Sequence, residues 1–282
     1  MVRRRIFAFL VGLGLAAPAA AGEVLRDLKA PSEALGRDLV YALYRPDGAR
    51  GPLPAVYLLH GRNSKAADWL DMAHAAETAD RLIAEGRIPP CLIVLPDAGN
   101  SWYAGTMAAA VARDLPNTIE KRHGALAARG GRALAGNSMG GFGAVGIALA
   151  YPDRFVAAAS MSGAFWMMLD EDKPLDTDMQ ARVSRVFEGA FGEPFARATF
   201  LKHSPFALAS GYAPAAIKPS VYLVSGAEDR FGLAEQSRKM LGLLRDRDFD
   251  VAYDTIPGDH DWGTWERSLP RALEFIARRW AR

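Results

Sequence analysis

One serine of the chain stands in a sequence setting typical of a nucleophile. Residues 136–140 read Gly-Asn-Ser-Met-Gly, so Ser138 has a glycine two positions before it and another two positions after it. A short β-prone segment, 133–135, precedes the motif, and an apolar segment with helical character, 140–150, follows it. A tight turn from strand to helix lifts the serine hydroxyl clear of the sheet. There the N–H groups and the dipole of the helix N-terminus stabilise an oxyanion. We therefore predict that Ser138 is the nucleophile of an acyl-transfer reaction.

A serine hydroxyl needs a base to become reactive, and His260 is the predicted base. It follows the last predicted strand, 251–256. In enzymes with this serine motif, the partners follow in the order serine, acid, histidine, and the histidine lies on a loop in that position. Histidine suits the task because it titrates near neutrality. The other four histidines are predicted to pack, face solvent or support loops: His60, His74, His123 and His203.

The acid should follow the strand that precedes the histidine strand. That strand, 221–224, is followed by Glu228 and Asp229. Asp229 is the preferred residue and Glu228 is the alternative. The acid would hold the tautomer of His260 and stabilise its cation.

Two backbone N–H groups are needed to hold the negative charge that develops on the substrate. One belongs to the residue after the nucleophile, Met139, and the other to the loop after the third strand, 60–64. We assign the second donor to Arg62, with Gly61 as the nearest alternative. His60 is predicted to support this loop and not to titrate in the reaction.

Eight short β-prone segments predict the strands that position these residues. They are 24–28, 39–44, 56–59, 92–95, 133–135, 155–161, 221–224 and 251–256. The first two have little helix between them and predict an antiparallel pair. From the third strand on, helical segments separate the strands, which predicts a mostly parallel sheet with helices on both faces. These helices are expected at 68–85, 107–122 with an interruption near Pro116, 140–150, 233–245 and 265–280.

About fifty residues, 165–214, do not follow this alternation. They are expected either as a lid-like insertion that shapes a substrate pocket or as a crossover connection with short helices. Long connections in compact domains are often functional.

From about Leu39 to its end, the chain resembles the esterase D family of α/β-hydrolases. This family includes tributyrin-type esterases, S-formylglutathione hydrolases, feruloyl esterases and mycolyltransferases. The segments that carry the resemblance are 57–61 with 68–70, 95–103, 135–144, 151–155, 162–163, 226–229, and 259–262 with Trp265. Segment 135–144, around the serine, is the most specific of them.

The resemblance implies an eight-stranded α/β-hydrolase that cleaves acyl esters through an acyl-enzyme, with a Ser-His-Asp triad and no metal or organic cofactor. The expected substrates are short-chain acyl or aryl esters. Trp69, Trp102 and Trp262 are expected to line the pocket, and Trp265 to pack in the core. The alternatives are an acyltransferase of the mycolyltransferase type, a thioesterase like S-formylglutathione hydrolase, and a binding protein without catalysis.

The first 21 residues are typical of a signal peptide. Three arginines, 3–5, precede a short apolar run, 6–15, and the run Ala19 to Ala21 predicts cleavage before Gly22. The alternative is an uncleaved membrane anchor, for which the apolar run is short. We therefore expect a secreted or periplasmic protein whose hydrolase domain spans residues 22–282, with no stable membrane insertion after cleavage.

The charge balance bears on the partner. Of the 34 basic residues, three lie in the leader, so 31 would face the 32 acidic ones in the mature chain. A nearly neutral chain argues against nucleic acid as the main partner. The expected partner is a small-molecule ester, and the oligomeric state stays open.

Overall fold

A single eight-stranded sheet forms the centre of the computed structural model, which describes residues 21–170 and 173–280. The strands are β1 (Glu23–Ala30), β2 (Leu39–Arg45), β3 (Ala55–Leu59), β4 (Leu92–Pro96), β5 (Arg132–Asn137), β6 (Ala157–Met161), β7 (Ser220–Gly226) and β8 (Val251–Ile256). Their spatial order is β1-β2-β4-β3-β5-β6-β7-β8. Strand β2 pairs antiparallel with β1 and with β4, and all other pairs are parallel. This confirms the predicted mostly parallel sheet.

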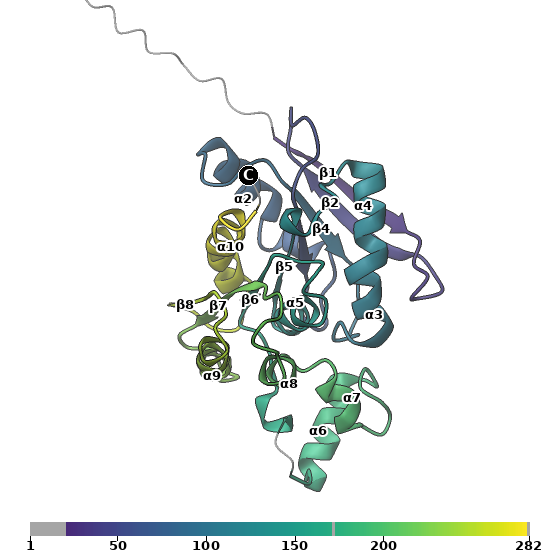
Figure 1. Ribbon diagram of the computed structural model, residues 1–282, viewed down its shortest axis with the longest axis vertical. Coiled ribbons are helices and arrows are strands. Elements are labelled where there is room, and N and C mark those ends of the chain that lie inside the picture. Colours follow the sequence, from purple (N-terminus) through teal and green to yellow (C-terminus); the bar gives the residue numbers. More distant parts are fainter. Residues whose placement is uncertain (1–20, 171–172, 281–282) are drawn as a thin grey trace, which may run out of the picture.

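Helices cover both faces of the sheet (Figure 1). They are α1 (Asp68–Asp71), α2 (Ala75–Ala84), α3 (Gly105–Ala109), α4 (Leu115–His123), α5 (Met139–Ala150), α6 (Thr177–Phe187), α7 (Arg197–Leu201), α8 (Pro205–Ser210), α9 (Leu233–Asp246) and α10 (Trp262–Ala277). Helices α1, α2 and α10 contribute to the hydrophobic cluster on one face, and α3, α4, α5 and α9 to the cluster on the other. No helix in 21–170 or 173–280 has both the length and the apolar character that a bilayer crossing requires.

The central strands are apolar on both faces because both faces are covered. Strands β3, β4 and β5 are buried along their whole length. Helix α5 is apolar around its whole circumference and is buried except at Ala150. It packs on β5 and β6, and helix α8 packs against it as well. The residue that begins this helix is therefore held by the core of the protein.

Two predicted helices differ from the structure for local reasons. The helix predicted over 68–85 is divided into α1 and α2, because His74 adopts a left-handed backbone conformation with φ of 46°. The helix predicted over 107–122 is not interrupted at Pro116. Pro116 is the second residue of α4, and a π-helical segment, Ala110–Asp114, joins α3 to α4, so the helical path runs through the proline. The Ala112 carbonyl, four residues before Pro116, accepts a hydrogen bond from Arg154 Nε at 3.2 Å in place of the missing N–H.

The first strand begins at a polar contact with α2. The N–H of Gly22 donates to both carboxylate oxygens of Asp80, at 3.1 and 3.0 Å, and the Tyr44 hydroxyl donates to one of them at 2.6 Å. A side chain at residue 22 would collide with the Tyr44 ring, since a Cβ there would lie 2.4 Å from it. Residues 1–20, which hold nearly all of the predicted leader, lie outside the described residues.

Candidate active site

Ser138 occupies the turn between β5 and α5 in a strained backbone conformation. Its φ is 52° and its ψ is −114°, a combination that L-residues rarely adopt. Hydrogen bonds hold this conformation in place, because the Ser138 N–H donates to the Met161 carbonyl at 3.0 Å and the Ser138 carbonyl accepts the N–H of Ala164 at 3.1 Å. The turn therefore presents the serine side chain away from the sheet.

The two glycines of the motif are required by close packing around this turn. A Cβ at Gly136 would lie 2.5 Å from the carbonyl carbon of Gly140, and a Cβ at Gly140 would lie 2.2 Å from the carbonyl oxygen of Leu59. Any larger residue would push α5 away from β3 and β5. The spacing of glycines that identified the serine thus has a direct steric cause.

The predicted histidine and aspartate converge on this serine. His260 Nε2 lies 3.0 Å from Ser138 Oγ, and His260 Nδ1 lies 2.9 Å from Asp229 Oδ2. The Asp229 side chain is fully buried and that of His260 is 10% exposed. With the carboxylate facing Nδ1, that nitrogen carries the proton and Nε2 is free to accept the serine proton. Three residues separated by up to 122 positions thereby form one hydrogen-bonded chain.

Asp229 is ionised in this arrangement. Burial acts to raise the pKa of Asp229, but the hydrogen bond and the charge of His260, together with the Phe231 N–H, outweigh burial and keep that pKa below its usual value. The Phe231 N–H donates to Asp229 Oδ1 at 3.0 Å. An ionised, immobile carboxylate can orient the imidazole and balance a positive charge on it.

The other carboxylates near His260 have structural partners. Glu228, the alternative acid, accepts the Gly258 N–H at 2.5 Å and joins the loops after β7 and β8. Hydrogen bonds from the side chain and backbone of Arg230 and from the His260 N–H lower the pKa of Asp259 to about 2. Asp261 caps α10 by accepting the Thr264 N–H at 2.8 Å. Each of these three carboxylates shapes the loop that carries His260, whereas the carboxylate bonded to its ring is that of Asp229.

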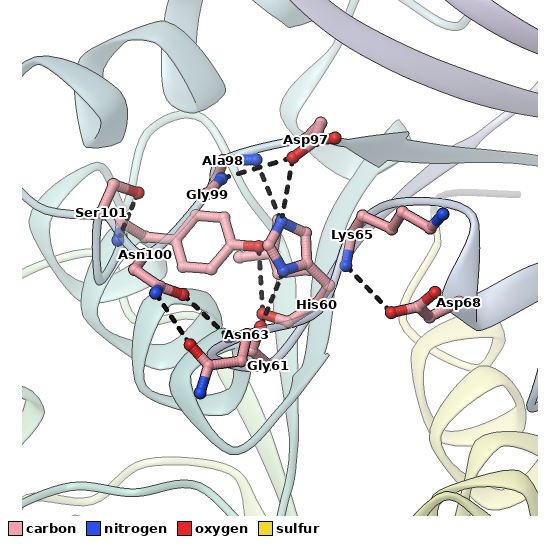
Figure 2. Close-up of polar contacts among 12 residues, drawn as sticks. His60, Gly61, Asn63, Lys65, Asp68, Asp97, Ala98, Gly99, Asn100 and Ser101 are labelled. Atoms are coloured by element: carbon pink, nitrogen blue, oxygen red, sulfur yellow. Dashed lines mark hydrogen bonds and ion pairs between the residues drawn. The ribbon is translucent and has the colours of Figure 1, made fainter. Parts of the chain in front are cut away.

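His60 fastens the loop that was expected to supply the second oxyanion donor (Figure 2). Its Nε2 accepts the Ala98 N–H at 3.0 Å and its Nδ1 donates to the Gly61 carbonyl at 2.8 Å. This pattern requires the neutral ring, and burial lowers the pKa of His60 in agreement with it. The Tyr103 hydroxyl also donates to the His60 carbonyl, at 3.2 Å.

The same loop lies beside the serine and is joined to the next loop by two asparagines. A Cβ on Gly61 would lie 3.6 Å from the Ser138 Cβ, so the backbone of this loop adjoins Ser138. The Asn63 N–H donates to Asn100 Oδ1 at 2.8 Å, and Asn100 Nδ2 donates to Asn63 Oδ1 at 2.9 Å (Figure 2). Met139, the other expected donor residue, is the first residue of α5, where a backbone N–H has no acceptor within the helix.

Ser138 and His260 open into a cavity of about 330 Å³. Its wall is largely aromatic and aliphatic, and it comes from the loops after β3, β4, β6 and β7, from α6, and from the start of α9 and α10. The lining residues are Gly61, Arg62, Ser64, Trp102, Ser138, Ala164, Trp166, Met168, Arg182, Val186, Phe231, Leu233, Gln236, His260 and Trp265. Four of them, Trp166, Met168, Arg182 and Val186, lie in segment 165–214. Segment 165–214 is thus the crossover between the parallel strands β6 and β7, with short helices, and it also forms one wall of the cavity; it is called the insertion below.

The tryptophans only partly occupy the expected places. Trp102 lines the cavity, and its indole N–H donates to the Val186 carbonyl at 3.1 Å. Trp69 does not contact the cavity, because it is fully buried and its indole N–H donates to the Leu59 carbonyl at 3.1 Å. Trp262 packs edge-on between Trp69 and Trp265 and is also absent from the lining. Trp265 packs in the hydrophobic core, as expected, and also lines the cavity beside His260. The expectation that Trp69 and Trp262 line the cavity is thus corrected.

The serine at a strand–helix turn, on an eight-stranded mostly parallel sheet between two helical layers, defines a serine hydrolase with the α/β-hydrolase fold. In 21–170 and 173–280, no group of three or more His, Cys, Asp or Glu side chains is arranged to hold a metal ion.

A family model described as "Putative esterase" matches residues 32–276, so the chain belongs to this esterase family of carboxylic ester hydrolases. It is 24% identical to an acetyl esterase of Caldicellulosiruptor saccharolyticus over 249 residues, which are 80% of this chain and 84% of the relative. It is 27% identical to the MPT51/MPB51 antigen of Mycobacterium bovis over 286 aligned residues, covering 92% of this chain and 90% of the antigen. A solved ferulic acid esterase superposes with a TM-score of 0.73 at 21% identity, covering 92% of this chain and 99% of the other.

Proposed function

We propose that this protein hydrolyses short-chain acyl or aryl esters through an acyl-enzyme, with Ser138 as nucleophile, His260 as general base and Asp229 as the acid that orients it. The observation that carries the proposal is the continuous hydrogen-bonded chain from Ser138 Oγ to His260 Nε2, at 3.0 Å, and from His260 Nδ1 to Asp229, at 2.9 Å. This chain opens into a cavity large enough for a small ester.

The reaction follows from these positions. Ser138 Oγ attacks the ester carbonyl while His260 Nε2 takes its proton, and the carbonyl oxygen becomes an oxyanion beside the N–H groups of Met139 and Arg62. Collapse of this intermediate breaks the bond to the alcohol, which leaves with the proton from Nε2. A water molecule then attacks the acyl-enzyme and gives its proton to Nε2, and Ser138 Oγ leaves with that proton as the acid is released. Asp229 balances the charge of His260 in both halves of the reaction.

The cavity supports the proposed substrates. Four aromatic side chains line it, namely Trp102, Trp166, Phe231 and Trp265, and they offer flat apolar surfaces to an acyl chain or an aromatic ring. The similarity to an acetyl esterase supports a small acyl group, and the shared fold of a ferulic acid esterase agrees with an aryl substrate.

Burst kinetics test the proposal. Mixing the enzyme with p-nitrophenyl acetate or butyrate should release one equivalent of p-nitrophenol per active site, followed by slower turnover. Mass spectrometry of the quenched enzyme should find the acyl group on the peptide that contains Ser138. Absence of turnover, or acylation at another residue, would overturn the proposal. An added alcohol or sugar acceptor distinguishes hydrolysis from acyl transfer, because a transferase would form the transesterified product in preference to the acid.

We also propose that the chain is exported and that residues 1–21 are removed. Cleavage before Gly22 would turn its backbone nitrogen into an α-ammonium group opposite the Asp80 carboxylate, and the 3.0–3.1 Å contacts already present there support this start. Expression of the full chain in a bacterium, followed by fractionation and intact-mass measurement, tests the idea. Recovery of the protein in the cytoplasm with its first 21 residues intact would reject it.

A further inference from the structure

The charged groups of the active-site cavity are unbalanced. Its lining includes two arginines, Arg62 and Arg182, and no aspartate or glutamate among the residues that the structure describes. Arg62 is neutralised nearby, because its guanidinium forms an ion pair with Glu188. Arg182 therefore provides the net positive charge on this wall.

Arg182 has an aromatic partner in place of an acidic one. Its guanidinium lies over the ring of Trp166, 5.2 Å from the ring centroid. In the described part of the chain it forms no ion pair, although Asp178 lies one helical turn before it on α6. Glu188, one and a half turns after it, is held by Arg62 and Asn100. A guanidinium stacked on a ring keeps its N–H edges available, and these edges match the two oxygens of a carboxylate.

The platform beneath Arg182 is fixed. Trp166 is 8% exposed and contacts Phe187 and Trp102 edge-on, with ring centroids 5.1 and 6.3 Å away. Phe187 lies on the same helix as Arg182, so helix α6 and this aromatic group hold one another in place. Arg182 lines the cavity and is itself exposed to solvent, so it can pair with an anionic group of a bound ester while water and salt screen the attraction.

We propose that Arg182 makes this enzyme selective for esters that carry a carboxylate, or a comparable anionic group, separate from the ester that is cleaved. The inference rests on the proposed function of Ser138 and names the substrate class for the same cavity. The carboxylate can belong to the alcohol part or to the acyl part of the ester, and both bring the same chemistry to Arg182.

Matched substrate pairs separate the two sources. For the alcohol part, 4-carboxyphenyl acetate is compared with 4-carbamoylphenyl acetate. For the acyl part, the p-nitrophenyl monoester of adipic acid is compared with that of its primary monoamide. The ratio of kcat/KM for the acid over the amide is measured for each pair. Comparing this ratio between variants cancels the intrinsic reactivity of the substrates.

In one of the two pairs, Arg182→Gln should lower this ratio by about fivefold to tenfold at low salt, and by less as salt screens the attraction. Arg182→Lys should retain part of the preference, because lysine keeps the charge without the planar fork. Arg185→Gln is the matched control, since Arg185 is an exposed arginine on the same helix and its side chain does not line the cavity. It should leave the ratio unchanged.

The inference is overturned if Arg182→Gln leaves the acid-to-amide ratio unchanged for both pairs. It is also overturned if Arg185→Gln lowers this ratio as much as Arg182→Gln does, because the preference would then come from the overall positive charge of α6 and not from Arg182. These outcomes are distinct from failure of the proposed function. In that case, the neutral amides are not hydrolysed either and Ser138 is not acylated.

Discussion

The guanidinium of Arg62 lies 2.5 Å from a carboxylate oxygen of Glu188, and this ion pair joins the loop after β3 to the end of α6. The same guanidinium also donates to the Arg185 carbonyl, at 3.3 Å. Hydrogen bonds from Asn100 and Arg62 lower the pKa of Glu188, so the carboxylate stays charged. The ion pair therefore connects the loop that borders Ser138 to segment 165–214, which forms one wall of the cavity.

Glu188→Gln should loosen this connection. We expect kcat/KM for p-nitrophenyl butyrate to fall by about threefold, in keeping with the small energy of an exposed ion pair. Amide hydrogen exchange in α6 should become faster, because the helix end loses an anchor. Glu193→Gln, an exposed acid of the same insertion, is the control. Unaltered exchange in α6 would show that the aromatic contacts alone hold the insertion.

Ser138→Ala should lower kcat by about 10⁴- to 10⁶-fold. The substitution removes only the hydroxyl, so the circular dichroism spectrum and the melting temperature should stay close to those of the unmodified protein. Labelling by a fluorophosphonate probe should also disappear. A variant that kept more than about a tenth of the activity would exclude Ser138 as the nucleophile.

Asp229→Asn and Glu228→Gln compare the two candidate acids directly. Asp229→Asn should lower kcat by about 10⁴-fold, because an amide favours the wrong tautomer of His260. Glu228→Gln keeps an acceptor for the Gly258 N–H and should change kcat by much less. The expected order of activities is reversed if Glu228 is the true partner of the histidine. Steady-state kinetics at neutral pH with one substrate suffices for this measurement.

Asp170 should give the protein a pH-dependent stability. Burial raises the pKa of Asp170 to about 6, and its carboxyl accepts a hydrogen bond from Ser204 at 2.7 Å. A raised carboxyl pKa stabilises the folded state fully below the unfolded value of about 3.9, and this contribution is lost as pH rises through about 6. Asp170→Asn does not titrate, so its melting temperature relative to wild type should increase from about pH 4.5 to about pH 7.5. The same difference at both pH values would contradict the expected shift.

That Ser138, His260 and Asp229 lie together could be predicted from the sequence, because each of them has a local signature. Gly136 and Gly140 flank Ser138 at a spacing typical of a tight strand–helix turn, although the contact that requires Gly140 is with Leu59 of β3. Asp229 and His260 follow strands whose apolar runs are easily recognised. Strands β1, β5 and β7 extend one or more residues beyond the predicted apolar runs at their ends, because backbone pairing continues where the side chains become polar.

The cavity wall could not be predicted in the same way. Trp166 and Arg182 reach the cavity through contacts between segments that are distant in sequence, and no repeat or spacing marks such contacts in advance. For Trp69 the sequence led to the opposite mistake. Its position near the predicted oxyanion loop suggested a pocket residue, yet its indole N–H donates to the Leu59 carbonyl inside the core. The break at His74 likewise depends on a left-handed residue that helical periodicity does not mark.

The origin of that wall has an evolutionary consequence. The proposed catalytic residues Ser138, Asp229 and His260 lie at the ends of β5, β7 and β8, whereas α6 and the segment before it come from a single stretch between β6 and β7. Evolution could therefore replace or remodel this one stretch and change the substrate specificity, while the strands that carry Ser138, Asp229 and His260 stay the same. Grafting residues 165–214 between relatives is a compact route to redesigning this enzyme.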